Sequence, residues 1–195
     1  IFDQMSGQDQ MLGLLFSRLT EIDVGDYVTL LLVSDHGMIN VNKYISLKDV
    51  LDSIEIDYIL SAGPAVAHIF IDDKAQRDEA LELLSRQDHM IAYRRENLPA
   101  SFHMNHPTRT GDLIVTTEPP YMFNNNPKDG PKGMHGYDPD LREMHAIFGA
   151  VGAGVRNERI GPIHMTDVAP TIAKLLGIKS VNHMQGRAIN LSSKD

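Results

Sequence analysis

Hydrophobic residues recur at spacings of three and four near the start of the chain, which is the pattern of a helix that buries one face. Within residues 8–19 this spacing is carried by Met11, Leu14, Leu15 and Leu19. It predicts an amphipathic helix packed on a sheet. A second helix is predicted over residues 74–86 from spacing of the same kind.

Apolar runs with few polar interruptions predict the strands. Residues 27–33 (YVTLLLV) lack the alternation of a half-buried strand. We therefore expect this strand to be covered on both faces, inside a parallel or mixed sheet. Further strands are predicted within residues 64–71, 90–94, 112–118 and 146–155.

The last predicted helix begins near Thr166. Thr166 and Asp167 offer N-cap oxygens, and Gly177 follows the last apolar residue. The apolar face is expected to consist of Ile172, Leu175 and Leu176. The order of helices and strands predicts an α/β protein, and the β-α-β run at about residues 60–110 is expected to form a small inserted subdomain.

Composition narrows the kind of protein. With 195 residues, 42% of them hydrophobic, the chain is long enough to bury a core as one domain, or as one domain with a small subdomain. The net charge of -8 disfavours a nucleic-acid duplex as partner, whereas small phosphate substrates stay possible if a divalent metal is bound. The chain has no cysteine, and no apolar run reaches the roughly 18 residues of a membrane span. Because it begins with Ile1, we expect a piece of a longer chain.

The strand predicted at residues 27–33 runs into Asp35 and His36, two polar groups that do not belong in an apolar interior. In one interpretation Asp35 caps a turn and His36 makes a buried hydrogen bond. In the other, both bind a metal ion at the carboxyl end of the strand, where ligand sites gather in open α/β sheets. Gly37 favours the metal because a residue without Cβ permits a sharp backbone path. A carboxylate and a neutral imidazole are suitable Zn²⁺ ligands.

A second polar cluster, KGMHGYDPD at residues 132–140, places His135 between two glycines just before an apolar strand. A lone loop histidine is more often solvated, but the glycines and the SDHG segment favour a metal ligand from a neighbouring strand. Asp138 either orients His135 as a hydrogen-bond acceptor or forms a turn before Pro139. Tyr121, in the loop before His135, either stacks on a nucleobase or packs near the core.

The other histidines are assigned no chemistry. His68 is expected to be a buried, hydrogen-bonded strand residue, and His103 and His106 are treated as surface residues. The sequence contains no GxSxG elbow, Walker-type phosphate loop, HExxH pair or full dinucleotide-binding glycine pattern. The sequence therefore gives no support for the enzyme classes that depend on these motifs.

Four successive segments resemble the type I phosphodiesterase/nucleotide pyrophosphatase family of the alkaline phosphatase superfamily. They are LLLVSDHGM, RTGDLIVTTEPPYMF, KGMHGYDPDLREMHAIFGAVGAGV and HMTDVAPTIAKLLGI. The resemblance spans residues 1–195 but corresponds only to the C-terminal portion of the family's catalytic domain. It implies an alkaline phosphatase-like α/β fold, with a mixed, mostly parallel sheet flanked by helices, present here as a partial domain.

The resemblance also implies a metal site, because the family's enzymes hold two zinc ions and form a covalent intermediate on a Thr or Ser. By that resemblance, Asp35 and His36 correspond to the Asp-His pair on the zinc that also binds the nucleophile. His135 corresponds to the late histidine on the other zinc. The nucleophile and the remaining ligands are expected upstream, so this chain contributes no catalytic nucleophile and, in isolation, is expected to bind zinc weakly and show no turnover.

The implied function is that of a portion of a zinc-dependent hydrolase of phosphodiester or pyrophosphate bonds in nucleotides or related small phosphate esters. An alkaline phosphatase-like monoesterase, a phosphonate hydrolase and a non-catalytic binding or structural module remain alternatives. Since the family's members are commonly exported, the resemblance implies a periplasmic or extracellular location for the parent protein.

Overall fold

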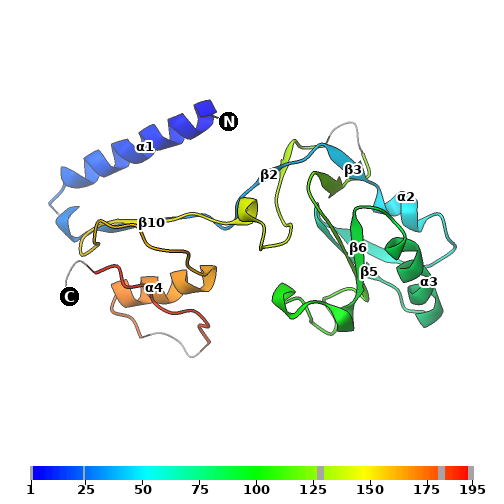
Figure 1. Cartoon of the computed structure of the whole chain (residues 1–195). Helices are drawn as coiled ribbons and strands as arrows, with labels where there is room; N and C mark the ends of the chain where they lie inside the picture. The colour runs from blue at the N-terminus through cyan, green and yellow to red at the C-terminus, as the bar shows by residue number, and fades with distance from the viewer. Residues whose placement is uncertain (1, 24, 127–129, 180–182, 193–195) are drawn as a thin grey trace. The chain divides into compact units, whose positions relative to one another are not determined.

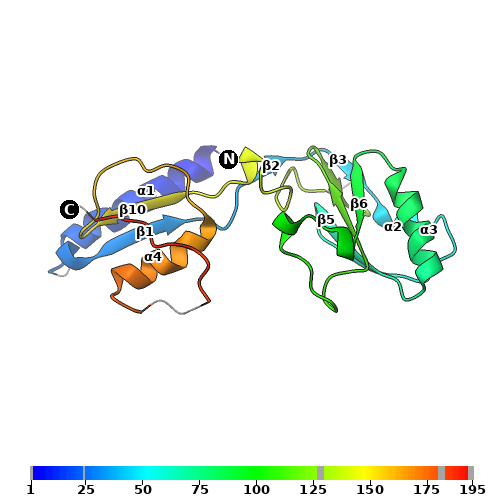
Figure 2. The ribbon, with the colours of Figure 1, turned by 60° about the horizontal axis from the view of Figure 1, so that its bottom comes forward.

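The computed structural model describes residues 2–23, 25–126, 130–179 and 183–192, and the chain divides into two compact units. Unit 1 combines the two ends of the chain, Ile1–Asp35 and Ala146–Asp195, and unit 2 is the middle segment, His36–His145. Figures 1 and 2 show the elements of both units in two views. Within the described residues, no helix combines the length and the apolar character needed to cross a membrane.

Unit 1 is built on a two-stranded antiparallel ribbon that lies between two helices. Its elements are α1 (Phe2–Thr20), η1 (Gly25–Tyr27), β1 (Thr29–Val33), β10 (Phe148–Gly152), η5 (Met165–Asp167) and α4 (Val168–Leu175). Strands β1 and β10 form the ribbon, with Leu31 opposite Ala150. Helices α1 and α4 lie on opposite sides of it (Figures 1 and 2).

The apolar pattern predicts where the elements of unit 1 lie in the sequence, but it does not predict which of their faces are buried. Helix α1 is longer than the predicted residues 8–19, and Met11, Leu14 and Leu15 are 68%, 52% and 43% exposed. The predicted packing of this face on a sheet is therefore wrong for the described chain. The prediction that the first strand is covered on both faces is also wrong, because β1 pairs with β10 in a two-stranded ribbon and Leu32 is exposed.

Helix α4 ends at Leu175, two residues before the predicted stop at Gly177, whose φ of +65° suits a residue without Cβ. Before the helix, the Asp167 carboxylate accepts a hydrogen bond from the backbone N–H of His164. The residues that α4 buries are Pro170, Thr171 and Ala173. The predicted apolar face is exposed instead, at 40%, 41% and 66% for Ile172, Leu175 and Leu176. Periodicity locates the helix, but its neighbours decide which face is covered.

Unit 2 contains a four-stranded antiparallel sheet and two smaller strand pairs, β2-β9 and β3-β8, with helices and helical turns around them. Its elements are β2 (Ile39–Asn40), β3 (Lys43–Ile45), α2 (Leu47–Leu51), β4 (Ile59–Ala62), β5 (Val66–Phe70), α3 (Lys74–Ser85), β6 (Met90–Arg94), η2 (Arg95–Asn97), η3 (Ala100–Phe102), β7 (Leu113–Thr117), β8 (Tyr121–Phe123), β9 (Gly133–Met134) and η4 (Arg142–Met144). The strand order in the large sheet is β4-β5-β7-β6. Strand β7 is antiparallel to both β5 and β6, so β5 and β6 run in the same direction. Together with α3 they form the predicted β-α-β run, and β7 lies between the two strands.

The α/β class is confirmed, but the strand pairing differs from the expected mostly parallel sheet. Among the described strands, β3 and β8 form the one parallel pair, and the other pairs are antiparallel. Sequence periodicity did not predict β2, β3, α2, β4, β8 and β9, since segments of two to five residues contain too few positions to establish a period. That residues 60–110 are an insertion in a larger catalytic domain stays a prediction.

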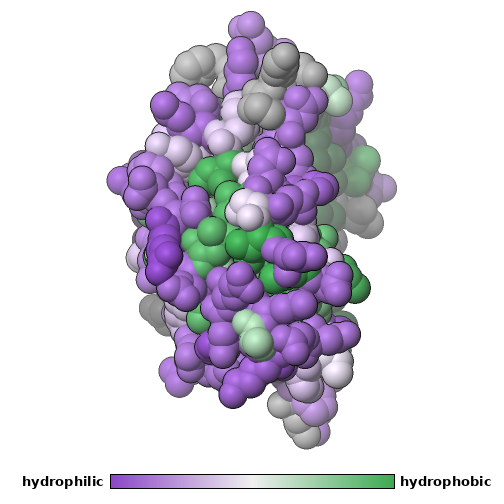
Figure 3. Space-filling view, turned by 90° about the vertical axis from the view of Figure 1, so that its right-hand side faces the viewer, coloured by the Kyte–Doolittle hydropathy of each residue, from purple (hydrophilic) through white to green (hydrophobic). Residues whose placement is uncertain are grey.

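The main core of unit 2 lies between the large sheet and helices α2 and α3. Leu51, Ile69 and Leu84 are completely buried there. Asp73 is the N-cap of helix α3, and its side chain accepts the N–H of Gln76 and so satisfies a donor in the first turn. Figure 3 shows hydrophobic surface enclosed by hydrophilic residues on the face that looks to the right in Figure 1.

Candidate metal centre

Two histidines that are far apart in the sequence meet at the short ladder of β2 and β9. His36 lies just before β2, and His135 directly follows β9. The ladder joins Ile39 to Met134, and so brings the two segments side by side. The half-buried imidazole rings stack, with their centroids 3.7 Å apart and their planes 13° from parallel.

The orientation of His36 is fixed by a hydrogen bond to its neighbour's backbone. The Nδ1 atom of His36 lies 2.8 Å from the carbonyl oxygen of Gly37. Because a carbonyl oxygen only accepts, Nδ1 carries the proton in this contact and Nε2 carries the lone pair. A metal-ligating histidine is commonly held in this way, by donating its other ring N–H to a carbonyl or carboxylate.

Gly37 is required where another backbone segment approaches closely. Its N–H donates to the carbonyl of Met144 at 2.9 Å. A Cβ at position 37 would lie 2.0 Å from the carbonyl oxygen of Glu143 and 2.9 Å from that of His145. The predicted need for a residue without a side chain therefore has a physical cause, and that cause is crowding by the segment that contains η4.

The third predicted ligand, Asp35, is exposed and is the last residue of the first segment of unit 1, whereas both histidines belong to unit 2. In the parts of the chain that the structure describes, no group of three or more His, Cys, Asp or Glu side chains could hold a metal ion. The structure thus brings two of the three predicted ligands together. The chemistry of these side chains fits zinc, but they do not form a complete zinc site.

Asp138 and Tyr137 shape the loop that follows His135. The Oδ1 atom of Asp138 accepts the backbone N–H of Asp140 at 2.9 Å, which is the turn geometry that one interpretation predicted. The hydroxyl of the buried Tyr137 donates to the carbonyl oxygen of Tyr121 at 2.6 Å. Burial raises the pKa of Tyr137 to about 12. The sequence did not predict the hydrogen bond from Tyr137 to Tyr121. The one feature that could have indicated it is an aromatic residue two positions after His135.

Tyr121, the candidate base-stacking residue, has one ring face occupied by a histidine. The rings of Tyr121 and His89 stack with centroids 3.9 Å apart. His89 also contacts the carboxylate of Glu118, with 3.3 Å between Nδ1 and Oε1. A role for Tyr121 in substrate binding stays a prediction.

The chain is similar in sequence to a known family of hydrolases. The model of the family described as type I phosphodiesterase/nucleotide pyrophosphatase matches residues 1–138. Human ectonucleotide pyrophosphatase/phosphodiesterase family member 5 is 30% identical over 184 residues, which cover 92% of this chain and 38% of the relative. Bis(5'-adenosyl)-triphosphatase enpp4 of Xenopus laevis is 28% identical over 173 residues, which cover 87% of this chain and 38% of that protein. The chain thus spans well under half the length of these relatives.

Solved structures agree with the sequence comparison. The structure of human ectonucleotide pyrophosphatase/phosphodiesterase 5 matches with a TM-score of 0.82 and 29% identity, over 93% of this chain and 49% of that chain. An inactive threonine-to-alanine variant of the murine protein, in complex with AMP, matches with a TM-score of 0.80, 28% identity and the same two coverages. The predicted alkaline phosphatase-like fold is thereby confirmed. The family model matches more than half of the residues of this chain, and the chain shares its fold with solved members of the family. The chain therefore belongs to the type I phosphodiesterase/nucleotide pyrophosphatase family.

Proposed function

We propose that this chain is the C-terminal portion of the catalytic domain of a zinc-dependent phosphodiesterase or nucleotide pyrophosphatase. The stacked pair of His36 and His135 is the observation that carries the proposal, because it joins the SDHG and MHGYD segments that resemble the family's ligand motifs. In the proposed site, Asp35 and His36 bind one zinc ion and His135 binds the other. The remaining ligands come from outside this chain.

The chain's own residues position the donor atoms. Donation from Nδ1 of His36 to the Gly37 carbonyl presents Nε2 as the ligand atom, and the N–H of Gly37 ties this turn to Met144. Bound zinc supplies positive charge that stabilises the negative charge developing on the phosphoryl oxygens. Positioning matters because catalysis of phosphoryl transfer depends mainly on geometry and electrostatics.

We further propose that the nucleophile is a threonine or serine outside this chain, which forms a covalent intermediate with the phosphoryl group. The inactive threonine-to-alanine variant of the murine relative supports a hydroxyl in this role. Nucleotides are the proposed substrates, supported by the AMP bound to that relative and by the triphosphatase name of the Xenopus relative. The name ectonucleotide pyrophosphatase of the human relative supports an exported parent protein.

The test uses the complete catalytic domain that contains this chain. Its kcat/KM is measured on bis(p-nitrophenyl) phosphate and on p-nitrophenyl phosphate, with zinc content determined in parallel. We expect the diester to be preferred, and His36→Ala or His135→Ala to lose zinc together with about 100-fold or more of the activity, as for disrupted metal sites. His183→Ala, which changes an exposed histidine that is not a proposed ligand, is the control and should leave both quantities unchanged. Preference for the monoester, or full activity in both variants, would contradict the proposal.

The isolated 195-residue chain gives a separate expectation. It should show no turnover of either ester, and zinc should bind weakly in calorimetric titrations, because the described residues supply fewer than three clustered ligands. A phosphodiesterase rate comparable to that of the complete domain would refute the assignment of the nucleophile to a missing segment.

A further inference from the structure

A cavity of about 780 Å³ opens in unit 2, on the side of the sheet where β6 and the end of β7 meet the loop after His135. This volume lies in the range of small-molecule sites. Most of the residues that line it are apolar or aromatic. The residues that form it include Val66, Met90, Tyr93, Phe102, Met104 and Tyr137.

The charges at the rim of the cavity have one sign. Glu118, Asp138 and Glu143 are exposed carboxylates among the lining residues. None of the described residues that line the cavity is Lys or Arg, and His89 is the one lining side chain able to carry positive charge. An anionic ligand group would therefore meet repulsion at the entrance, and a cation would meet attraction.

Aromatic rings inside the cavity add a second preference for a cation. Tyr93 and Phe102 pack edge to face, with centroids 5.8 Å apart and an interplanar angle of 77°. Ring faces attract organic cations through the negative potential of the π system, and the attraction grows as the site loses water. The cavity thus combines apolar contact, aromatic faces and acidic charge.

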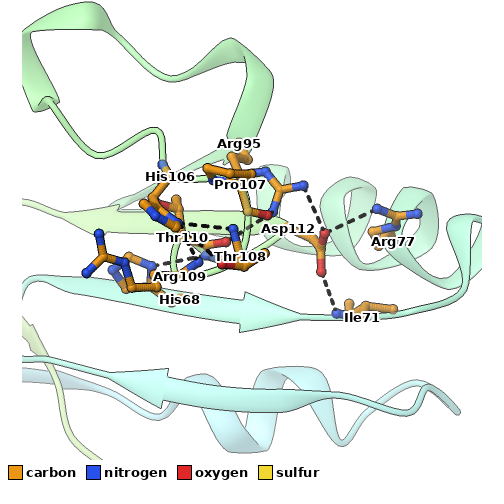
Figure 4. Close-up of polar contacts among 11 residues, drawn as sticks. His68, Ile71, Arg77, Arg95, His106, Pro107, Thr108, Arg109, Thr110 and Asp112 are labelled. Carbon is orange, nitrogen blue, oxygen red and sulfur yellow. Dashed lines mark hydrogen bonds and ion pairs between the residues drawn. The ribbon is translucent and has the colours of Figure 1, made fainter.

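The wall that carries Phe102 and Met104 is held in place by the loop that follows it. The hydroxyl of Thr110 donates to the carbonyl of Met104 at 2.6 Å and accepts the N–H of His106 at 3.0 Å. Arg95 donates to the carbonyl oxygens of Pro107 and Thr110 at 2.9 and 3.2 Å (Figure 4). This network fixes the wall before any ligand arrives, which reduces the entropy lost on binding.

The base of the same loop is fixed by Asp112. Its carboxylate accepts the N–H of Ile71 at 3.1 Å and forms ion pairs with Arg77 and Arg95 at 3.3 and 3.6 Å (Figure 4). These two guanidinium groups point to Asp112, whose single carboxylate offsets one of their two positive charges. Their charge does not cancel the acidic rim, since neither arginine lines the cavity.

We propose that this cavity binds an amphipathic organic cation, in which an ammonium group lies among the rim carboxylates and an apolar body fills the interior. The inference concerns binding alone and does not depend on the proposed hydrolase function. Glu118 already contacts Nδ1 of His89 at 3.3 Å, so we take Asp138 and Glu143 as the main source of attraction.

The test compares three probes of similar size: benzyltrimethylammonium, benzyl alcohol and benzoate. Each is titrated into the full 195-residue chain at low ionic strength, and backbone amide shifts locate the site. We expect the cation to bind most tightly and benzoate least tightly, with shifts at residues that line the cavity. Asp138→Asn and Glu143→Gln should each weaken the cation about fivefold, as expected for loss of one charge a few ångströms away, and should leave benzyl alcohol unchanged.

Two further variants separate charge from ring contact. Glu55→Gln removes an exposed carboxylate of unit 2 that does not line the cavity, and should not change the affinity for the cation. Phe102→Leu keeps an apolar side chain but removes a ring, and should weaken the cation more than the alcohol. Equal affinity for all three probes, tighter binding of benzoate, shifts away from the cavity, or no binding of any probe would overturn the inference.

Discussion

At the scale of single residues, the candidate metal centre is positioned by backbone contacts, namely the pairing of β2 with β9 and the close approach of η4 to Gly37. His36 and His135 stack because β2 and β9 are paired, and the turn between His36 and β2 is close enough to η4 to exclude a side chain at Gly37. The sequence alone identified both histidines and the glycine. It did not show that the glycine is needed because of the carbonyl oxygens of Glu143 and His145.

Gly37→Ala should therefore destabilise the fold and disturb the histidine pair. The new Cβ would lie 2.0 Å from a backbone oxygen, so the neighbouring segment must shift, and we expect a loss of about 1–3 kcal/mol of unfolding free energy in urea titrations. Gly13→Ala is the matched control. Its site lies within α1 with nothing within 4 Å, so the change should stabilise the helix by roughly 0.5–1 kcal/mol. Equal effects of the two changes would contradict the role given to Gly37.

At the scale of elements, hydrogen bonds join strands to loops at positions that sequence periodicity does not reveal. Strand β5 is joined to the loop before β7, because the N–H of Gly111 donates to Nδ1 of His68 at 3.2 Å. The predicted hydrogen bond of His68 is thus present, but the residue is half-buried rather than buried. His106 is not merely a surface residue, since its Nδ1 accepts the N–H groups of Thr108 and Arg109, each at 3.2 Å. A ring nitrogen can accept these bonds only when it carries no proton.

This arrangement predicts how stability depends on pH. Burial lowers the pKa of His68 below its ordinary value of 6.5. The unfolded chain therefore binds a proton at this position more readily than the folded chain, so the contribution of His68 is complete above about pH 6.5 and declines as the pH falls below it. Urea unfolding at about pH 7.5 and about pH 5.5 measures this loss.

The variant His68→Asn should reduce the loss of stability between these two pH values. His103→Asn is the control, because His103 is exposed and its φ of +50° is tolerated by asparagine. It should show the same loss as the unmodified chain. If His68→Asn also leaves the pH dependence unchanged, the hydrogen bond from Gly111 is not sensitive to protonation as argued.

At the scale of the whole molecule, the two units differ in how much hydrophobic surface they cover. Unit 2 has a core of completely buried side chains between its sheet and its helices. In unit 1, the described part of α1 exposes Met11, Leu14, Leu15 and Phe16 to at least 37%. A two-stranded ribbon with open edges is a weak structure in water, and a contiguous apolar helix face marks a surface that other protein covers. The match to about half of a solved relative agrees with this view.

The isolated chain should consequently self-associate as its concentration rises, which sedimentation velocity would detect as an increasing mean sedimentation coefficient. Replacing Met11 and Leu14 by lysine should reduce the association, because it breaks the apolar face of α1. Replacing the exposed Gln8 and Gln10 by lysine adds the same charge without removing apolar surface, and should have a smaller effect. Monomeric behaviour of the unmodified chain at all concentrations would show that this face needs no covering.

The sequence by itself determined the long elements α1, α3, β5, β6 and β7, the family, and the residue types of the candidate metal centre. These follow from local signals, since apolar periodicity, capping residues and short motifs act over a few neighbouring positions. Only the tertiary structure decided that β7 lies between β5 and β6, that His36 meets His135, and that the predicted faces of α1 and α4 are exposed. Each of these depends on contacts between segments far apart in the chain. An apolar pattern indicates that one face of an element can be buried, but it does not indicate which other segment covers that face.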